Sequence, residues 1–251
     1  MSLAEHLREL RRRILIAMVG ILLGAIVGWI LAGPIWDALR EPILSLTTEQ
    51  DRELARLNYT EVTSAFMLRL QMAVTFGFVI SAPIWLWQAW AYLLPALTKG
   101  ERRGAMGFIL AAVPLFFAGC TLAVFLIPYV LKIMTGFAAP EEAVLLNATT
   151  YFDFVFRFVV AIGVGFLLPV VLVLLNVIGV LSAKSIRKGW RVTVLIVSIF
   201  AAIVTPPADI VSMLALIGVM LLLFLVAIVI TTLRDRARAK RFPELYSDAT
   251  A

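Results

Sequence analysis

The chain has 251 residues, of which 62% are hydrophobic and only 15% are charged. Soluble proteins average about half apolar and a quarter charged residues, so this composition predicts an integral membrane protein with no room for a soluble enzyme domain. The net charge of +6 lies in small basic clusters at the ends of apolar runs, which indicates membrane topology rather than a nucleic-acid surface.

The first thirteen residues, "MSLAEHLRELRRR", predict a short amphipathic helix at the membrane interface. Ser2 and Glu5 have the spacing of a capping box, and the leucines fall on the face opposite the charges. The apolar run Ile14–Ala32 follows. It is longer than the ~7–15 apolar residues of a signal peptide and long enough to cross a ~30 Å hydrocarbon core, so we expect a retained first helix.

Five further apolar runs follow, separated by short polar segments. The fifth run of the chain, "VTVLIVSIFAAIV", has only 13 residues, or about 20 Å of helix, and is short for a full crossing. The prediction is an all-α membrane protein with six transmembrane helices. The runs after the first are Phe66–Leu94, Ala105–Leu131, Tyr151–Leu181, Val192–Val204 and Ile210–Leu233.

Lysine and arginine divide unequally between alternate connecting segments. The N-terminus, residues 95–104, residues 182–191 and the C-terminal tail hold sixteen of them, whereas the segments on the other side hold four. Because basic flanks stay on the cytoplasmic side, both termini are predicted to be cytoplasmic. We expect one integral domain over residues 1–233 and a basic cytoplasmic tail over residues 234–251.

Glu101 is the one acid in "PALTKGERR", between the second and third runs. It has capping-box spacing from Thr98, so it could simply cap the third helix. Glu9 could likewise pair with Arg13 four residues on. Both acids nevertheless fall on the same predicted face, where two carboxylates would suit a ligand that presents neighbouring arginines before an apolar segment.

Polar residues within the runs have structural interpretations. Asp153 and Arg157 have the spacing of an intrahelical ion pair, and Arg69 could snorkel, although a functional site in the wall stays open. Three amides are expected to make interhelical hydrogen bonds rather than bind a ligand. They are Gln71, Gln88 and Asn176.

Three stretches, "MSLAEHLRELRRRI", "SAPIWLWQAWAYLLPALTKGERR" and "TPPADIVSM", resemble the TatC family, the large integral subunit of the twin-arginine protein translocase. The resemblance runs from Ser2 to about Leu233. It implies a bent, cup-like bundle whose last two helices are short. It also implies a receptor that recognises the paired arginines of signal peptides on the cytoplasmic face, with single-span partner subunits, the proton motive force as driver and no cofactor.

The resemblance also assigns residues to a signal-peptide site. The family's loop glutamate and the acid of its N-terminal motif correspond to Glu101 and Glu9. The remaining binding candidates are Tyr92, Arg11, Arg13 and Arg103.

Other positions match the family with departures. Pro42 and Asp209 match features of the outer side, but "TPPAD" displaces Asp209 by one residue. Leu167 stands where the family commonly has a glutamate that contacts a partner helix, and Ser64 where it often has an acid.

Two rival functions remain. A small-molecule transporter would call for polar residues near the midplane and an internal repeat, neither of which the sequence shows. An intramembrane hydrolase would need a base at depth, but His6, the only histidine, lies at the predicted surface. With Cys120 as the only cysteine, an intramolecular disulfide and a cysteine-rich metal site are also excluded.

Overall fold

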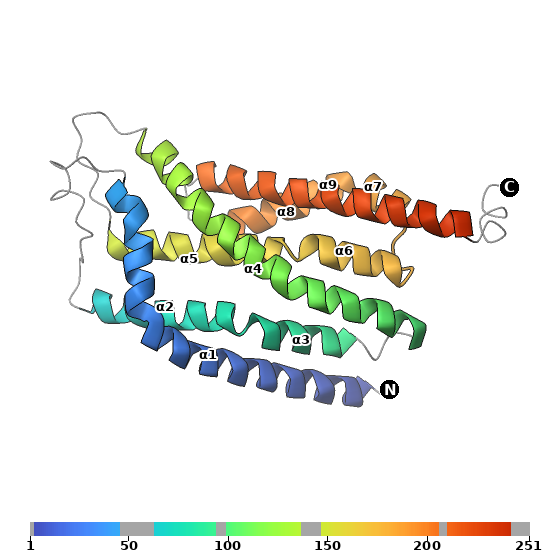
Figure 1. The fold of residues 1–251 in the computed structure, drawn as a ribbon, viewed down its shortest axis with the longest axis horizontal. Coiled ribbons are helices and arrows are strands. Elements are labelled where there is room, and N and C mark those ends of the chain that lie inside the picture. The colour runs from blue at the N-terminus through green and yellow to red at the C-terminus, as the bar shows by residue number, and fades with distance from the viewer. Residues whose placement is uncertain (1–2, 46–62, 94–98, 137–146, 206–209, 242–251) are drawn as a thin grey trace.

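The computed structural model describes the backbone of residues 3–45, 63–93, 99–136, 147–205 and 210–241, and most of their side chains (Figure 1). This part of the chain is helical. Its helices are α1 (Leu3–Ser45), α2 (Ser64–Ile80), α3 (Ala82–Leu93), α4 (Lys99–Thr135), α5 (Ala148–Gly165), α6 (Leu168–Val177), α7 (Ala183–Lys188), α8 (Trp190–Val204) and α9 (Ile210–Arg241).

Four stretches of the described helices are long and apolar enough to cross a membrane, and a fifth forms if α2 and α3 count as one span bent by 55°. The pair α5 and α6 counts as a single stretch, Ala148–Val177. The remaining apolar helix, α8, has 15 residues, which confirms that the fifth run is short. A multi-pass membrane protein is therefore established, whereas a sixth crossing by α8 stays a prediction.

Two predictions about the ends of the chain are wrong. The amphipathic N-terminal segment is not a separate helix, because α1 runs without a break from Leu3 to Ser45. No glycine or proline stands near Arg13 to end a helix there. The last apolar helix is not short either: α9 has 32 residues and continues past Leu233, since strong helix formers such as alanine and arginine follow.

Prolines account for the breaks within the predicted spans. The second run divides at Ser81, two residues before Pro83, and the fourth divides at Phe166 and Leu167, just before Pro169. Proline lacks the backbone donor and its ring clashes with the preceding turn, so a helix tends to end or bend there. By contrast, α4 contains Pro114 and Pro128 without a break.

A stripe of glycines allows α1 to pack closely against α2. A Cβ atom on Gly24 would lie 2.5 Å from the carbonyl oxygen of Gly77, and one on Gly28 would lie 2.7 Å from that of Ala73. Small residues let two membrane helices approach until their backbones touch, which is how helices associate where lipid is as apolar as their side chains.

The main apolar core surrounds α5, which contacts α2, α4, α8 and α9. Aromatic rings of α5 fill it: Phe152 is fully buried and stacks on Trp36 of α1 at 4.5 Å between ring centroids. Phe156 meets Phe76 of α2 edge to face. Thus α5 is the central helix of the bundle.

Figure 1 shows which helix ends lie together. The start of α1, the end of α3, the start of α4, the end of α6 and the end of α9 lie at one end of the bundle, here called the terminal end. The segments richest in lysine and arginine therefore share one side, as their distribution predicts. That this side faces the cytoplasm stays a prediction.

Candidate functional site

At the terminal end, α1 contacts α3 through polar side chains. Tyr92 Oη lies 2.6 Å from His6 Nε2, and the two rings stack with centroids 4.5 Å apart. Two turns further along α1, Arg13 donates from Nε to Glu9 Oε1 at 2.7 Å and from Nη1 to Gln88 Oε1 at 3.0 Å. We call these five residues the α1–α3 cluster.

The α1–α3 cluster is only partly shielded. About a quarter of the Glu9 and Arg13 side chains remains exposed, and His6 is exposed. The predicted Glu9–Arg13 pair is confirmed, so Glu9 already has a cationic partner within its own helix. Gln88 also joins two helices as predicted, although it accepts from an arginine rather than donates.

The other predicted binding residues lie on helix segments at the same end of the bundle as this cluster. Glu101 and Arg103 lie in the first turns of α4, which begins at the terminal end, and Arg11 is exposed on α1 between Glu9 and Arg13. The structure describes the backbone of Glu101 and Arg103 but not their side chains. Since α4 begins at Lys99, Glu101 is its third residue, as a capping box with Thr98 requires; Thr98 itself lies outside the described residues.

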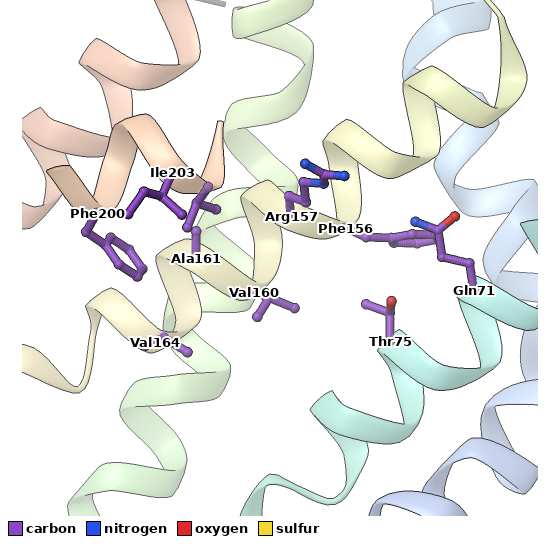
Figure 2. Close-up of a pocket in the computed structure, with 10 residues that line it drawn as sticks. Gln71, Thr75, Phe156, Arg157, Val160, Ala161, Val164, Phe200 and Ile203 are labelled. Atoms are coloured by element: carbon purple, nitrogen blue, oxygen red, sulfur yellow. The ribbon is translucent and has the colours of Figure 1, made fainter. Parts of the chain in front are cut away.

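A second polar network lies in the wall of the bundle. Gln71 of α2 donates to Asp153 of α5 at 2.8 Å, and Asp153 pairs with Arg157 at 2.7 Å. The predicted ion pair and the predicted interhelical amide are both confirmed. They lie beside an open cavity of about 370 Å³, where Figure 2 shows Gln71 and Thr75 on one side and Phe200 and Ile203 on the other.

Arg69 has an aromatic partner near the same end of α2. Its guanidinium carbon lies 4.9 Å from the centroid of the Trp29 ring on α1. It also lines a smaller cavity of about 220 Å³ together with Trp36. Arginine over tryptophan is a favourable cation–π contact, and here it joins α1 to α2.

Leu167 lies at the break between α5 and α6. It packs against apolar residues of α3, α4 and α6, Trp90, Ala112 and Val170 among them. A leucine suits these neighbours, whereas a glutamate would place a carboxylate beside buried apolar groups. Pro42 lies within α1, where its side chain is not described, and Asp209 lies outside the described residues.

The predicted interhelical hydrogen bond of Asn176 is confirmed, but sequence reasoning missed its partners. They form a third polar cluster, the α6–α9 clamp, which consists of Asn176, Ala183, Arg234 and Asp235. Asn176 donates to Asp235 Oδ1 at 3.1 Å and accepts from Arg234 Nη1 at 3.1 Å. The backbone N–H of Ala183 donates to Asp235 Oδ2 at 2.9 Å. Asn176 is only 4% exposed and Ala183 is buried, whereas Arg234 and Asp235 are partly exposed. For the partners of Asn176 the signal was an isolated acid, Asp235, among the basic residues 234–241.

Among the described residues, no group of three or more histidine, cysteine, aspartate or glutamate side chains could hold a metal ion. The polar groups of the terminal end are instead carboxylates, guanidinium groups, amides and aromatic rings. These can recognise a charged peptide by hydrogen bonds and ion pairs.

Comparison with known proteins places this multi-pass helical chain among protein translocases. The family model for the Sec-independent protein translocase protein (TatC) matches residues 5–218. The TatC protein of Xylanimonas cellulosilytica is 36% identical over 241 residues, which cover 96% of this chain and 87% of that protein. The TatC protein of Rothia mucilaginosa is 35% identical, with 98% of this chain and 84% of that protein covered.

Solved structures agree with this placement. A crystal structure of the twin-arginine translocase receptor TatC is 27% identical, with a TM-score of 0.79 over 91% of this chain and 98% of that one. A second crystal structure of this receptor, in DDM, is 28% identical, with a TM-score of 0.78 over 90% of this chain and 99% of that one. The chain belongs to the TatC family, a component of twin-arginine translocation.

Proposed function

We propose that the chain is the core receptor subunit of the twin-arginine translocation system. It binds the twin-arginine signal peptides of folded proteins at the terminal end and organises their export, driven by the proton motive force. It resides in the bacterial cytoplasmic membrane with this end inward. Family membership makes this function a stronger candidate than small-molecule transport.

The observation that carries the proposal is the convergence of α1, α3 and α4 at the terminal end. These helices bear Glu9, Tyr92 and Glu101, from stretches far apart in the sequence. A peptide that approaches this end can reach both carboxylate-bearing helices at once. In the proposed complex, the carboxylates bind the guanidinium groups, whose planar fork suits bidentate pairing.

The Glu9–Arg13 pair shapes how binding proceeds. An incoming arginine must displace Arg13 from Glu9 or share the carboxylate with it, and Gln88 can hold Arg13 meanwhile. Partly exposed pairs contribute only about 0–1 kcal/mol, so this exchange costs little. Glu101 of α4 is the principal docking carboxylate because it matches the family's loop glutamate, and Arg103 of α4 and Arg11, which is exposed on α1, are the basic residues of the site.

The carboxylates select the peptide more than they hold it. Charge-assisted hydrogen bonds contribute about 1.5–3 kcal/mol each when shielded, whereas micromolar binding needs about 8 kcal/mol. The rest comes from contact between the peptide's apolar segment and the helices. Small single-span subunits complete the homo- and hetero-oligomeric translocase, with Leu167 as a contact position and with Pro42 and Asp209 acting on the outer side.

Glu101→Gln tests the proposal, with Glu5→Gln as a control for loss of a carboxylate from the same end of the bundle. We expect Glu101→Gln to lower export of a twin-arginine substrate and signal-peptide crosslinking from position 92 by more than tenfold. Glu5→Gln should retain both. Protein levels in the membrane should be equal. Normal export by Glu101→Gln would remove this residue from the site, and loss of the protein from the membrane would favour the capping role instead.

A further inference from the structure

A cluster of four cations lies on α7 and the first turn of α8. Its members are Lys184, Arg187, Lys188 and Arg191, and all four are exposed. No aspartate or glutamate occurs anywhere in residues 178–205. We call this group the α7 basic surface.

The α6–α9 clamp fixes the orientation of α7. Ser182 caps the helix by accepting from the Ser185 N–H at 3.1 Å, and the Ala183 N–H donates to Asp235. Ala183 and Ile186 are buried. With one face bound in this way, the basic side chains must project outward.

Among the described residues, the acid that contacts the start of α7 is Asp235, and its described hydrogen bonds do not involve the four cations. Asp235 uses one oxygen for Asn176 and the other for the Ala183 N–H, both part of the clamp. Its hydrogen bonds are thus directed to α6 and to the start of α7 rather than to the exposed cations. The α7 basic surface therefore presents a concentrated positive charge.

An exposed apolar face continues directly from this charge. Trp190 is 52% exposed, and the guanidinium carbon of Arg191 lies 5.6 Å from the centroid of its ring. Tryptophan favours the level of lipid headgroups. The exposed residues of α8 beyond Arg191 are all apolar: Val192, Leu195, Ile196, Ile199, Ala202 and Ile203.

We propose that the α7 basic surface binds the headgroup of an anionic phospholipid whose acyl chains lie along the exposed face of α8. The cations supply complementary charge for a phosphate, and arginine can bind it through paired N–H groups. Because an exposed apolar face adjoins the cations, the site suits a lipid rather than a soluble anion. This lipid would hold α8, the helix too short for a simple crossing, against the bundle.

The test is native mass spectrometry of the full-length protein, titrated with phosphatidylglycerol or with phosphatidylcholine of the same acyl chains. We compare Arg187→Gln/Lys188→Gln with Arg8→Gln/Arg12→Gln, which removes two exposed cations from α1. Each charge near an anionic surface contributes about fivefold in affinity, so the α7 pair should weaken phosphatidylglycerol binding about 25-fold. The α1 pair should change it less than threefold.

Two further arms address folding and the identity of the ligand. Arg187→Lys retains the charge and should retain binding, which separates charge loss from misfolding of α7. Preference for phosphatidylglycerol should fall as salt is raised. Equal binding of both lipids, equal loss in both double variants, or full competition by inorganic phosphate or an acidic peptide at the same concentration would overturn the proposal.

Discussion

At the terminal end of the bundle, one polar cluster joins α1 to α3 and another joins α6 to α9. The α1–α3 cluster contains the Glu9–Arg13 pair, whose side chains are about one quarter exposed. The α6–α9 clamp is centred on Asn176, which is 4% exposed. Both clusters use an acid, an arginine and an amide.

Burial separates the roles of these clusters. A buried polar group that loses its partner costs about 1–3 kcal/mol, because water cannot replace that partner, so the hydrogen bonds of the buried Asn176 and Ala183 must stay intact. In the α1–α3 cluster, water or a ligand can take the place of a lost partner. Exchange of partners is what the proposed recognition of an arginine pair requires, and the clamp instead fixes the neighbouring basic surface.

Gly24→Leu should have the largest effect on stability, because it displaces the helix that carries the exposed cluster. Any side chain at this position meets the Gly77 backbone, so α1 must move away from α2 and carry the α1–α3 cluster with it. We expect a loss of about 3 kcal/mol in the free energy of unfolding, at the upper end for overpacking. Unfolding in detergent measures this.

Gly33→Leu is the matched control for Gly24→Leu. It lies in the same helix, yet a Cβ there would have no atom within 4 Å. It should change stability by less than about 0.5 kcal/mol, as a typical surface substitution does. An equal loss in the free energy of unfolding for both variants would mean that the glycine stripe does not hold α1 against α2.

Asp235→Ala should destabilise the clamp by about 2 kcal/mol, since the buried Ala183 N–H would lose its only described acceptor. Arg236→Ala, at an exposed neighbouring position, should leave the free energy of unfolding nearly unchanged. Hydrogen exchange should also accelerate in α7 of Asp235→Ala. Unchanged exchange there would contradict the assigned role of Asp235.

The sequence predicted the apolar helices and missed most of what joins them. Length and hydropathy mark α4 and α9, because a lipid environment requires continuous apolar helices. The Asp153–Arg157 pair was predictable because its spacing is local. The contacts of Asp235 with Ala183 and of Arg13 with Gln88 join residues that are distant in sequence, and no local spacing encodes them. The lengths of α1 and α9 were missed because charged residues end a hydrophobic run without ending a helix.

Gln88→Leu tests how far water can replace a lost partner in the α1–α3 cluster. It removes the acceptor for Arg13 Nη1, but Arg13 keeps Glu9 and gains access to water. We expect less than about 1 kcal/mol of destabilisation, compared with about 2 kcal/mol for Asp235→Ala. A loss equal to that of Asp235→Ala would show that the α1–α3 cluster is as closed to water as the clamp.

Tyr92→Phe should have the smallest effect. It removes the hydrogen bond to His6 but leaves the ring, so an exposed contact worth about 0.5 kcal/mol is lost. If the ring face receives a guanidinium group of the signal peptide, Tyr92→Phe should bind the peptide normally. Tyr92→Ala should bind about two- to fivefold more weakly, because an exposed cation–π contact contributes about 0.5–1 kcal/mol. Peptide affinity measured in detergent distinguishes Tyr92→Phe from Tyr92→Ala. Equal weakening in both variants would assign the role of Tyr92 to its hydroxyl and the hydrogen bond with His6. The α1–α3 contact would then act on the peptide through the position of α1.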